Sequence, residues 1–114
     1  MTEEEKRCDL LIRQTGGTVF AFSTPKKSPF PDVPDRRYRM HSFAFWAEIK
    51  KHPDKLSQGQ YDFLIAEYNC GEIVFAGDYD QLRHLVTKLP YDQWRSFGMD
   101  CILALWARGP RKVR

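Results

Sequence analysis

The stretch from residue 61 to residue 89 constrains the fold more than any other part of the chain. It begins with two short apolar runs, Tyr61–Ala66 and Ile73–Ala76, and Gly71 lies in the polar segment between them. Each run has about the length of one β-strand, and a glycine between two such runs is typical of a hairpin. The pattern therefore predicts a β-hairpin in the middle of the chain.

A helix over the first of these runs is the main alternative. Its apolar residues also recur at helical spacing, as Tyr61, Leu64, Ile65 and Tyr68. Ser57 and Gln60 have the spacing of a capping box, and Gly71 is a suitable helix end. Gly59 near the start and several aromatic residues close together favour the strand. We therefore keep the hairpin as the prediction.

The segment that follows has the clearest helical pattern in the sequence. Asp78 or Asp80 can cap its N-terminus, and Pro90 stops it. One apolar stripe runs along it, formed by Leu82, Leu85, Val86 and Leu89. We expect this helix to cover one face of a sheet.

The N-terminal segment predicts one helix and one strand. Thr2 and Glu5 have capping-box spacing, and the apolar residues after them recur at helical spacing as far as Gln14. The run Thr18–Ser23 is rich in β-branched and aromatic residues and is bounded by glycine and proline. We expect it to form the first strand.

Two further segments fit both kinds of element. Residues 41–51 alternate as a strand does, but their alanine, glutamate and lysine content favours a helix that ends before Pro53, which is the prediction made here. The run Cys101–Ala107 has strand length, and we expect a buried closing strand preceded by a short helix over Tyr91–Phe97. One longer helix from Tyr91 is the alternative.

These elements together predict a single α+β domain over residues 1–114. A chain of 114 residues with 42% hydrophobic residues is long enough to bury a core without metals or disulfides. We expect a small, mainly antiparallel sheet with the N-terminal helix and the 80–89 helix on one face. An all-α fold is the alternative if both ambiguous segments are helices.

A basic, proline-rich segment is the strongest candidate for a binding site. Residues 24–39 contain four prolines and are expected to form a surface loop, and residues 109–114 a mobile basic tail. Guanidinium groups can neutralise phosphate and aromatic rings can stack on bases, so such a cluster suits single-stranded nucleic acid or an acidic protein surface. The candidate partner-binding residues are Lys26, Lys27, Arg36, Arg37, Tyr38, Arg39 and Trp46.

No catalytic, metal or cofactor site is expected from the pattern of reactive residues. The three histidines are dispersed, and the three cysteines form no short metal-binding spacing. Cys70 lies in the expected turn, where an exposed thiol can act as a nucleophile. Asp78 and Asp80 are interpreted as helix caps. No apolar run approaches the roughly 20 residues needed to span a membrane.

The function expected from these features is a non-enzymatic, cytoplasmic accessory or regulatory module. It would bind a protein partner, with an acidic surface, through the loop at 25–39 and its flanks. The net charge of +3 is only mildly basic, so a nucleic-acid-binding protein that uses Arg36–Arg39 and the C-terminal tail is the alternative. A small thiol or histidine enzyme is a third hypothesis.

Overall fold

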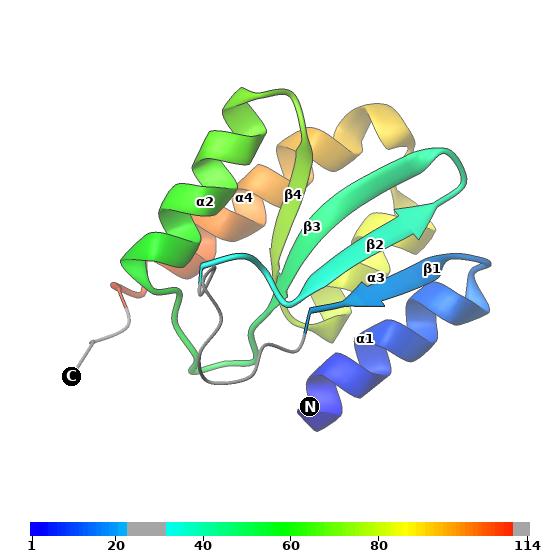
Figure 1. The fold of residues 1–114 in the computed structure, drawn as a ribbon, viewed down its shortest axis with the longest axis horizontal. Helices are drawn as coiled ribbons and strands as arrows, with labels where there is room; N and C mark the ends of the chain where they lie inside the picture. The colour runs from blue at the N-terminus through cyan, green and yellow to red at the C-terminus, as the bar shows by residue number, and fades with distance from the viewer. Residues whose placement is uncertain (23–31, 111–114) are drawn as a thin grey trace.

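The computed structural model describes residues 1–22 and 32–110, and this part of the chain forms one mixed sheet with helices around it (Figure 1). The elements in chain order are α1 (Glu3–Gln14), β1 (Thr18–Ala21), β2 (Arg36–Met40), β3 (Phe43–Ile49), α2 (Gln58–Asn69), β4 (Ile73–Gly77), α3 (Tyr79–Lys88), the 3-10 helix η1 (Tyr91–Gln93) and α4 (Trp94–Trp106). The prediction of a small α+β fold is confirmed.

The sheet has the strand order β1-β2-β3-β4. The first three strands are antiparallel neighbours, and β4 runs parallel to β3. A parallel neighbour requires a crossover connection, which α2 provides. The sheet is therefore mainly antiparallel, as predicted, with one parallel edge strand.

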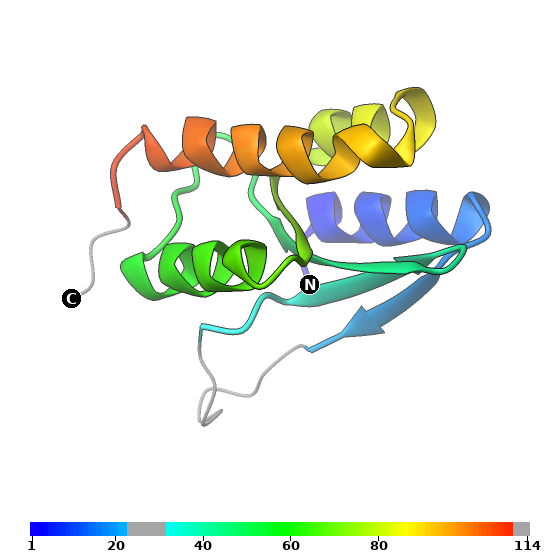
Figure 2. The same ribbon diagram turned by 90° about the horizontal axis from the view of Figure 1, so that it is seen from above.

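The helices α1, α3 and α4 lie on the same side of the sheet (Figure 2). Tyr38, Phe45 and Phe75 point from the strands into this layer, where they form a core with Leu82 and other buried residues. A second core cluster lies around β4, between α2 and α4. Among the described helices, none lies in front of β1 and β2 in Figure 1, so that face of the two strands is open.

Three of the helices begin with a capping box. In each, the side chain of the N-cap residue and the side chain three positions later satisfy each other's backbone N–H groups, as in Thr2–Glu5, Ser57–Gln60 and Asp78–Gln81. The predictions of helices at the N-terminus and after Asp78 are confirmed. None of the helices in the described ranges is long and apolar enough to cross a bilayer.

The predicted central hairpin is wrong. Residues 58–69 form helix α2, and only the second apolar run, at 73–77, is a strand. The Ser57–Gln60 capping box stabilises the first turn, and Gly71 follows the helix end with a positive φ of 93°. These local signals outweigh the strand preference of the aromatic residues.

Three other predictions are also corrected. Residues 43–49 are a central strand, not a helix, because their alternating side chains pack on the two faces of the sheet. Residues 101–106 belong to α4, not to a strand, and the longer C-terminal helix was the right alternative. Residues 36–39 lie in β2, not in a loop, whereas residues 23–31 and 111–114 of the predicted loop and tail lie outside the described residues.

Helix α4 approaches β4 unusually closely at Gly98. A Cβ atom at this position would collide with the carbonyl oxygen of Val74. Only glycine allows this backbone contact, so the position of α4 on the edge of the sheet depends on residue 98.

Candidate functional site

The basic cluster of the sequence is divided between the two faces of the sheet. Successive residues of a strand point to opposite faces, and β2 begins at Arg36. Arg36 and Tyr38 are buried on the face covered by α1, whereas Arg37 and Arg39 project from the open face. Of the predicted binding residues, the structure brings together Arg37, Arg39 and Trp46. Lys26 and Lys27 lie outside the described residues.

Arg36 and Tyr38 have a structural role. The Nε atom of Arg36 donates to both carboxylate oxygens of Asp9 in α1, at 2.9 and 3.1 Å, and the Tyr38 hydroxyl donates to the same carboxylate at 2.8 Å. Burial and the Asp9 carboxylate together raise the pKa of Tyr38. The two residues fix α1 to β2 and are not available to a partner.

Two carboxylates meet where the β2–β3 ladder ends. Arg36 lies opposite Ala47 in the register, so Asp35 and Glu48, the next residues outward, lie opposite each other. Asp35 lies just before β2, where its carboxyl group contacts Glu5 of α1, and Glu48 lies on the face of β3 that packs against α2, where Gln60 donates to it. Asp35 is half-buried, and the side chain of Glu48 is almost completely buried. This is an unfavourable arrangement for two negative charges.

The pKa values of both carboxyl groups reflect this crowding. Burial, followed by the negative charge of Asp35, raises the pKa of Glu48 to about 7. Burial and the nearby Glu5 carboxylate of α1 raise the pKa of Asp35. Raised carboxyl pKa values next to each other are more typical of a functional site than of a stabilising ion pair.

Lys50 and Gln60 complete the group. The Nζ atom of Lys50 lies 3.8 Å from Oε1 of Glu48, and only 12% of the Lys50 side chain is exposed. The Nε2 atom of Gln60 in α2 donates to the same Glu48 oxygen at 3.3 Å. The second oxygen of Glu48, Oε2, is buried without a hydrogen-bond partner among the described residues. We call Asp35, Glu48, Lys50 and Gln60 the carboxylate site.

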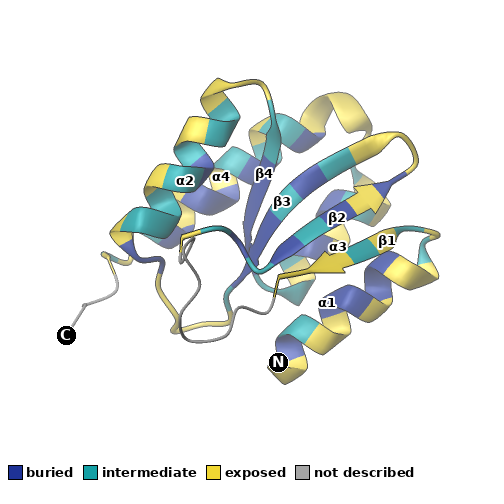
Figure 3. Ribbon diagram, viewed as in Figure 1, coloured by how far each residue is buried: buried dark blue, intermediate teal, exposed yellow. Residues whose placement is uncertain are grey.

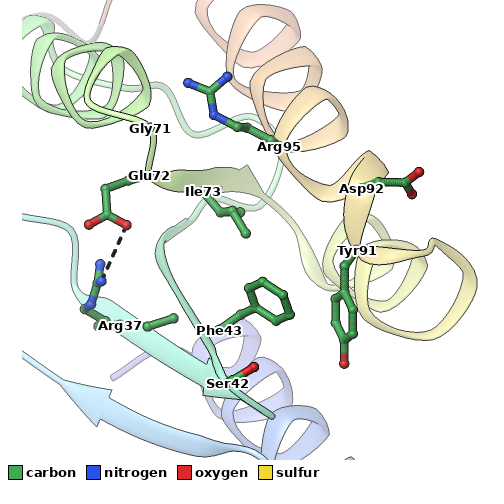
Figure 4. A pocket seen from close by; sticks show the side chains of 10 residues that line it. Arg37, Ser42, Phe43, Gly71, Glu72, Ile73, Tyr91, Asp92 and Arg95 are labelled. Atoms are coloured by element: carbon green, nitrogen blue, oxygen red, sulfur yellow. Dashed lines mark ion pairs between the residues drawn. The ribbon is translucent and has the colours of Figure 1, made fainter.

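Two other features of the described structure are weaker candidates for a reactive site. Cys70 is exposed at the C-terminal end of α2, and no histidine in the described ranges forms a hydrogen bond with it. A cavity of about 490 Å³ lies at the opposite end of β3, next to Phe43, Tyr91 and an ion pair of 3.7 Å between Arg37 and Glu72 (Figure 4). It contains no pair of adjacent carboxylates.

The carboxylate site was not predicted from the sequence. Glu48 and Lys50 are two positions apart, which on a strand places both side chains on one face. The alternation of Phe43, Phe45 and Ala47 was the signal for that strand, but the segment was interpreted as a helix. Residues two positions apart do not share a face of a helix, so the helical interpretation did not predict that Glu48 and Lys50 lie together.

Comparison with known proteins gives one informative match. No protein-family model and no curated protein matches the sequence. Among solved structures, the chain is similar to one described as a VRR_NUC domain, with a TM-score of 0.64 and 20% sequence identity. The match covers 79% of this chain and 100% of that chain. At this level of identity the similarity shows a shared fold.

The match corrects one expectation from the sequence. A fold shared with a member of a nuclease domain family contradicts the interpretation of the chain as a non-enzymatic module. That interpretation rested on the lack of an assembled group of reactive residues in the sequence, and the fold brings Glu48, Lys50 and Gln60 together near Asp35. The match is more compatible with the nucleic-acid alternative than with a protein-binding regulator.

Proposed function

We propose that the chain is a nuclease that hydrolyses phosphodiester bonds at the carboxylate site. The observation that carries the proposal is the pair of crowded carboxylates, Asp35 and Glu48, with the ammonium group of Lys50 beside them. The similarity to the VRR_NUC domain supports the same reading.

A phosphate group would be repelled by this site without a cation. Asp35 and Glu48, with Glu5 nearby, place more negative charge at the site than Lys50 compensates. A divalent cation reverses this balance. The proposed chemistry therefore requires a cation such as Mg²⁺ between the phosphate and the carboxylates.

The residues present fit such an ion. The described residues contain no group of three His, Cys, Asp or Glu side chains arranged as a metal site. Mg²⁺, however, keeps several water ligands and is commonly held by one or two carboxylates together with substrate phosphates. Asp35 and the unpartnered Oε2 atom of Glu48 supply these two carboxylates. When bound, the ion would act as a Lewis acid on a phosphoryl oxygen.

Lys50 and Gln60 have separate roles in this proposal. The Lys50 ammonium places a fixed positive charge where negative charge develops on the phosphate during hydrolysis. Gln60 is a positioning residue, because its amide nitrogen holds one oxygen of Glu48 and leaves the other free. Both act from rigid elements of the fold.

Cleavage of labelled single-stranded and duplex DNA by the purified chain tests the proposal. We expect cleavage with Mg²⁺ or Mn²⁺, none with EDTA, and a loss of about 10²-fold or more in Glu48→Gln and Lys50→Ala. Asp100→Asn, which changes an exposed carboxylate on α4, is the control and should cleave as the wild type does. A wild-type chain inactive with both metals, or Glu48→Gln at the wild-type rate, would contradict the proposal.

A further inference from the structure

The open face of β1 and β2, together with Trp46 on the adjoining strand β3, carries aromatic and basic side chains. Phe20 and Phe22 are large apolar residues that are 39% and 42% exposed, and Arg39 beside them is also exposed. The guanidinium carbon of Arg39 lies 5.2 Å from the centre of the Phe20 ring, and that of Arg37 lies 4.6 Å from the centre of the Trp46 ring. We call Phe20, Phe22, Arg37, Arg39 and Trp46 the open-face cluster.

The cluster forms one continuous surface. Phe20 lies opposite Arg37 in the strand register, and the centres of the Phe22 and Trp46 rings are 6.0 Å apart. Figure 3 shows that most residues of β1 are exposed, and that buried residues alternate with half-buried or exposed ones along β2. Exposed phenylalanines on a face that no described helix covers indicate a surface that binds something.

The charge of the cluster favours an anionic partner. Arg39 forms no ion pair with another described residue. Arg37 is paired with Glu72 only at 3.7 Å, and its Nη1 atom is buried without a hydrogen-bond partner in the described part of the chain. Among the described residues, a second acid, Glu67, contacts the cluster by accepting a hydrogen bond from the Trp46 indole at 2.8 Å. The exposed guanidinium group of Arg39 therefore has donors available to a phosphate.

The cluster is also continuous with the carboxylate site. Trp46 and Glu48 lie two positions apart on the same face of β3, and Asp35 lies two positions before Arg37 of β2. Two residues along a strand correspond to about 7 Å. The carboxylate site therefore lies next to the cluster along the strands.

We infer that the open-face cluster binds a single-stranded segment of nucleic acid and leads it to the carboxylate site. The inference rests on the proposed nuclease function and adds the form of its substrate. Bases stack on Phe20, Phe22 and Trp46, while Arg37 and Arg39 contact phosphates. Such stacking requires unpaired bases, because the bases of a duplex are already stacked on one another.

The binding test uses fluorescence anisotropy of a labelled oligothymidylate of about 12 nucleotides in EDTA, so that cleavage does not interfere. We expect Phe20→Ala and Arg39→Ala each to weaken binding at least about tenfold. Arg39→Ala should also lower the slope of log affinity against log salt by about 0.7, as expected for one lost phosphate contact. Circular dichroism checks the fold of both variants, whose altered side chains are exposed.

Matched controls lie on other surfaces of the molecule. Leu103→Ala removes an exposed leucine from α4, and Arg83→Ala removes an exposed arginine from α3. Both should bind the oligonucleotide as the wild type does. Quenching of tryptophan fluorescence by the oligonucleotide should be lost in Trp46→Phe, which provides a second readout.

Several outcomes would overturn the inference. One is that the wild type does not bind the oligonucleotide at all, and another is that the control variants bind it as weakly as Phe20→Ala and Arg39→Ala do. A duplex of the same sequence binding as tightly as the single strand would also overturn it. So would displacement of the oligonucleotide by a polyglutamate peptide of equal charge. Cleavage that continues unchanged in Phe20→Ala and Arg39→Ala would refute this inference alone. Binding that depends on the cluster in a chain that cleaves nothing would refute the nuclease proposal alone.

Discussion

Replacing Glu48 with glutamine is expected to stabilise the protein while it abolishes cleavage. The side chain is buried opposite Asp35, with Lys50 and Gln60 as its other polar neighbours and Glu5 further along α1. Burial and the Asp35 charge raise its pKa from the ordinary 4.5 to about 7. The folded state therefore holds the Glu48 proton more tightly than the unfolded state does.

The sign of the effect follows from this difference. Below pH 4.5 Glu48 is protonated in both states, and its contribution to stability is fully present. Between pH 4.5 and about 7 the unfolded state releases this proton while the folded state keeps it, so the stability falls, and the loss is complete once the pH has risen past about 7. At about 1.4 kcal/mol per pKa unit, the loss approaches about 3 kcal/mol by pH 8. Glutamine has no ionisable group, so the Glu48→Gln variant does not lose this stability as the pH rises.

Thermal and urea unfolding between pH 4 and pH 8, in EDTA and at constant ionic strength, measure the difference. The Glu48→Gln variant should match the wild type near pH 4 and exceed it by up to about 3 kcal/mol, or about 10 °C in Tm, at pH 8. Mg²⁺ at pH 8 should stabilise the wild type and not the variant. Asp100→Asn should show no such dependence on pH. A variant less stable than the wild type at pH 8, or a difference independent of pH, would refute the reasoning.

Three further predictions concern the core and the cysteines. Asp9→Ala removes the closer carboxylate of the buried Arg36 guanidinium, leaves Glu5 at 3.8 Å, and should lower the free energy of unfolding by about 3 kcal/mol, measured by urea denaturation. Gly98→Ala places a methyl group against the Val74 carbonyl oxygen and should cost about 1–3 kcal/mol, with no such cost for Ala at the exposed Ser96 of the same helix. Of the three cysteines, only Cys70 is exposed, and burial raises the pKa of the other two to about 12. A thiol reagent should therefore modify one cysteine rapidly in the native protein and all three in denaturant, and rapid modification of more than one would contradict the packing.

The helices with strong local signals were predictable from the sequence. α1 and α3 have capping boxes, and each buries one stripe against the sheet, so periodicity and caps agree. In α2 only Leu64 is fully buried, and the aromatic residues of the helix are half-buried. The helix therefore has no single apolar stripe in the sequence, and its aromatic residues led to the wrong prediction of a strand.

The central strand and the carboxylate site were harder to predict. Both faces of β3 are packed, so apolar residues such as Phe45 and Trp46 follow one another and obscure the alternation. Asp35 and Glu48 are 13 positions apart in the sequence, and only the β2–β3 register brings them together. The cluster of arginines was visible from the sequence, but its division between two faces depends on β2 being a strand.

The side chain of Gln60 restricts what this position can tolerate. Its oxygen accepts from the Ser57 backbone N–H at 3.0 Å, and its nitrogen donates to Glu48 at 3.3 Å. Glutamate would keep the first contact and place another negative charge beside the second, whereas lysine could donate to Glu48 but would add a positive charge and lose the helix cap. Asparagine is one methylene shorter and cannot span both contacts. In a saturation library, position 60 should therefore accept almost no substitution when selection requires activity, and several when it requires folding alone.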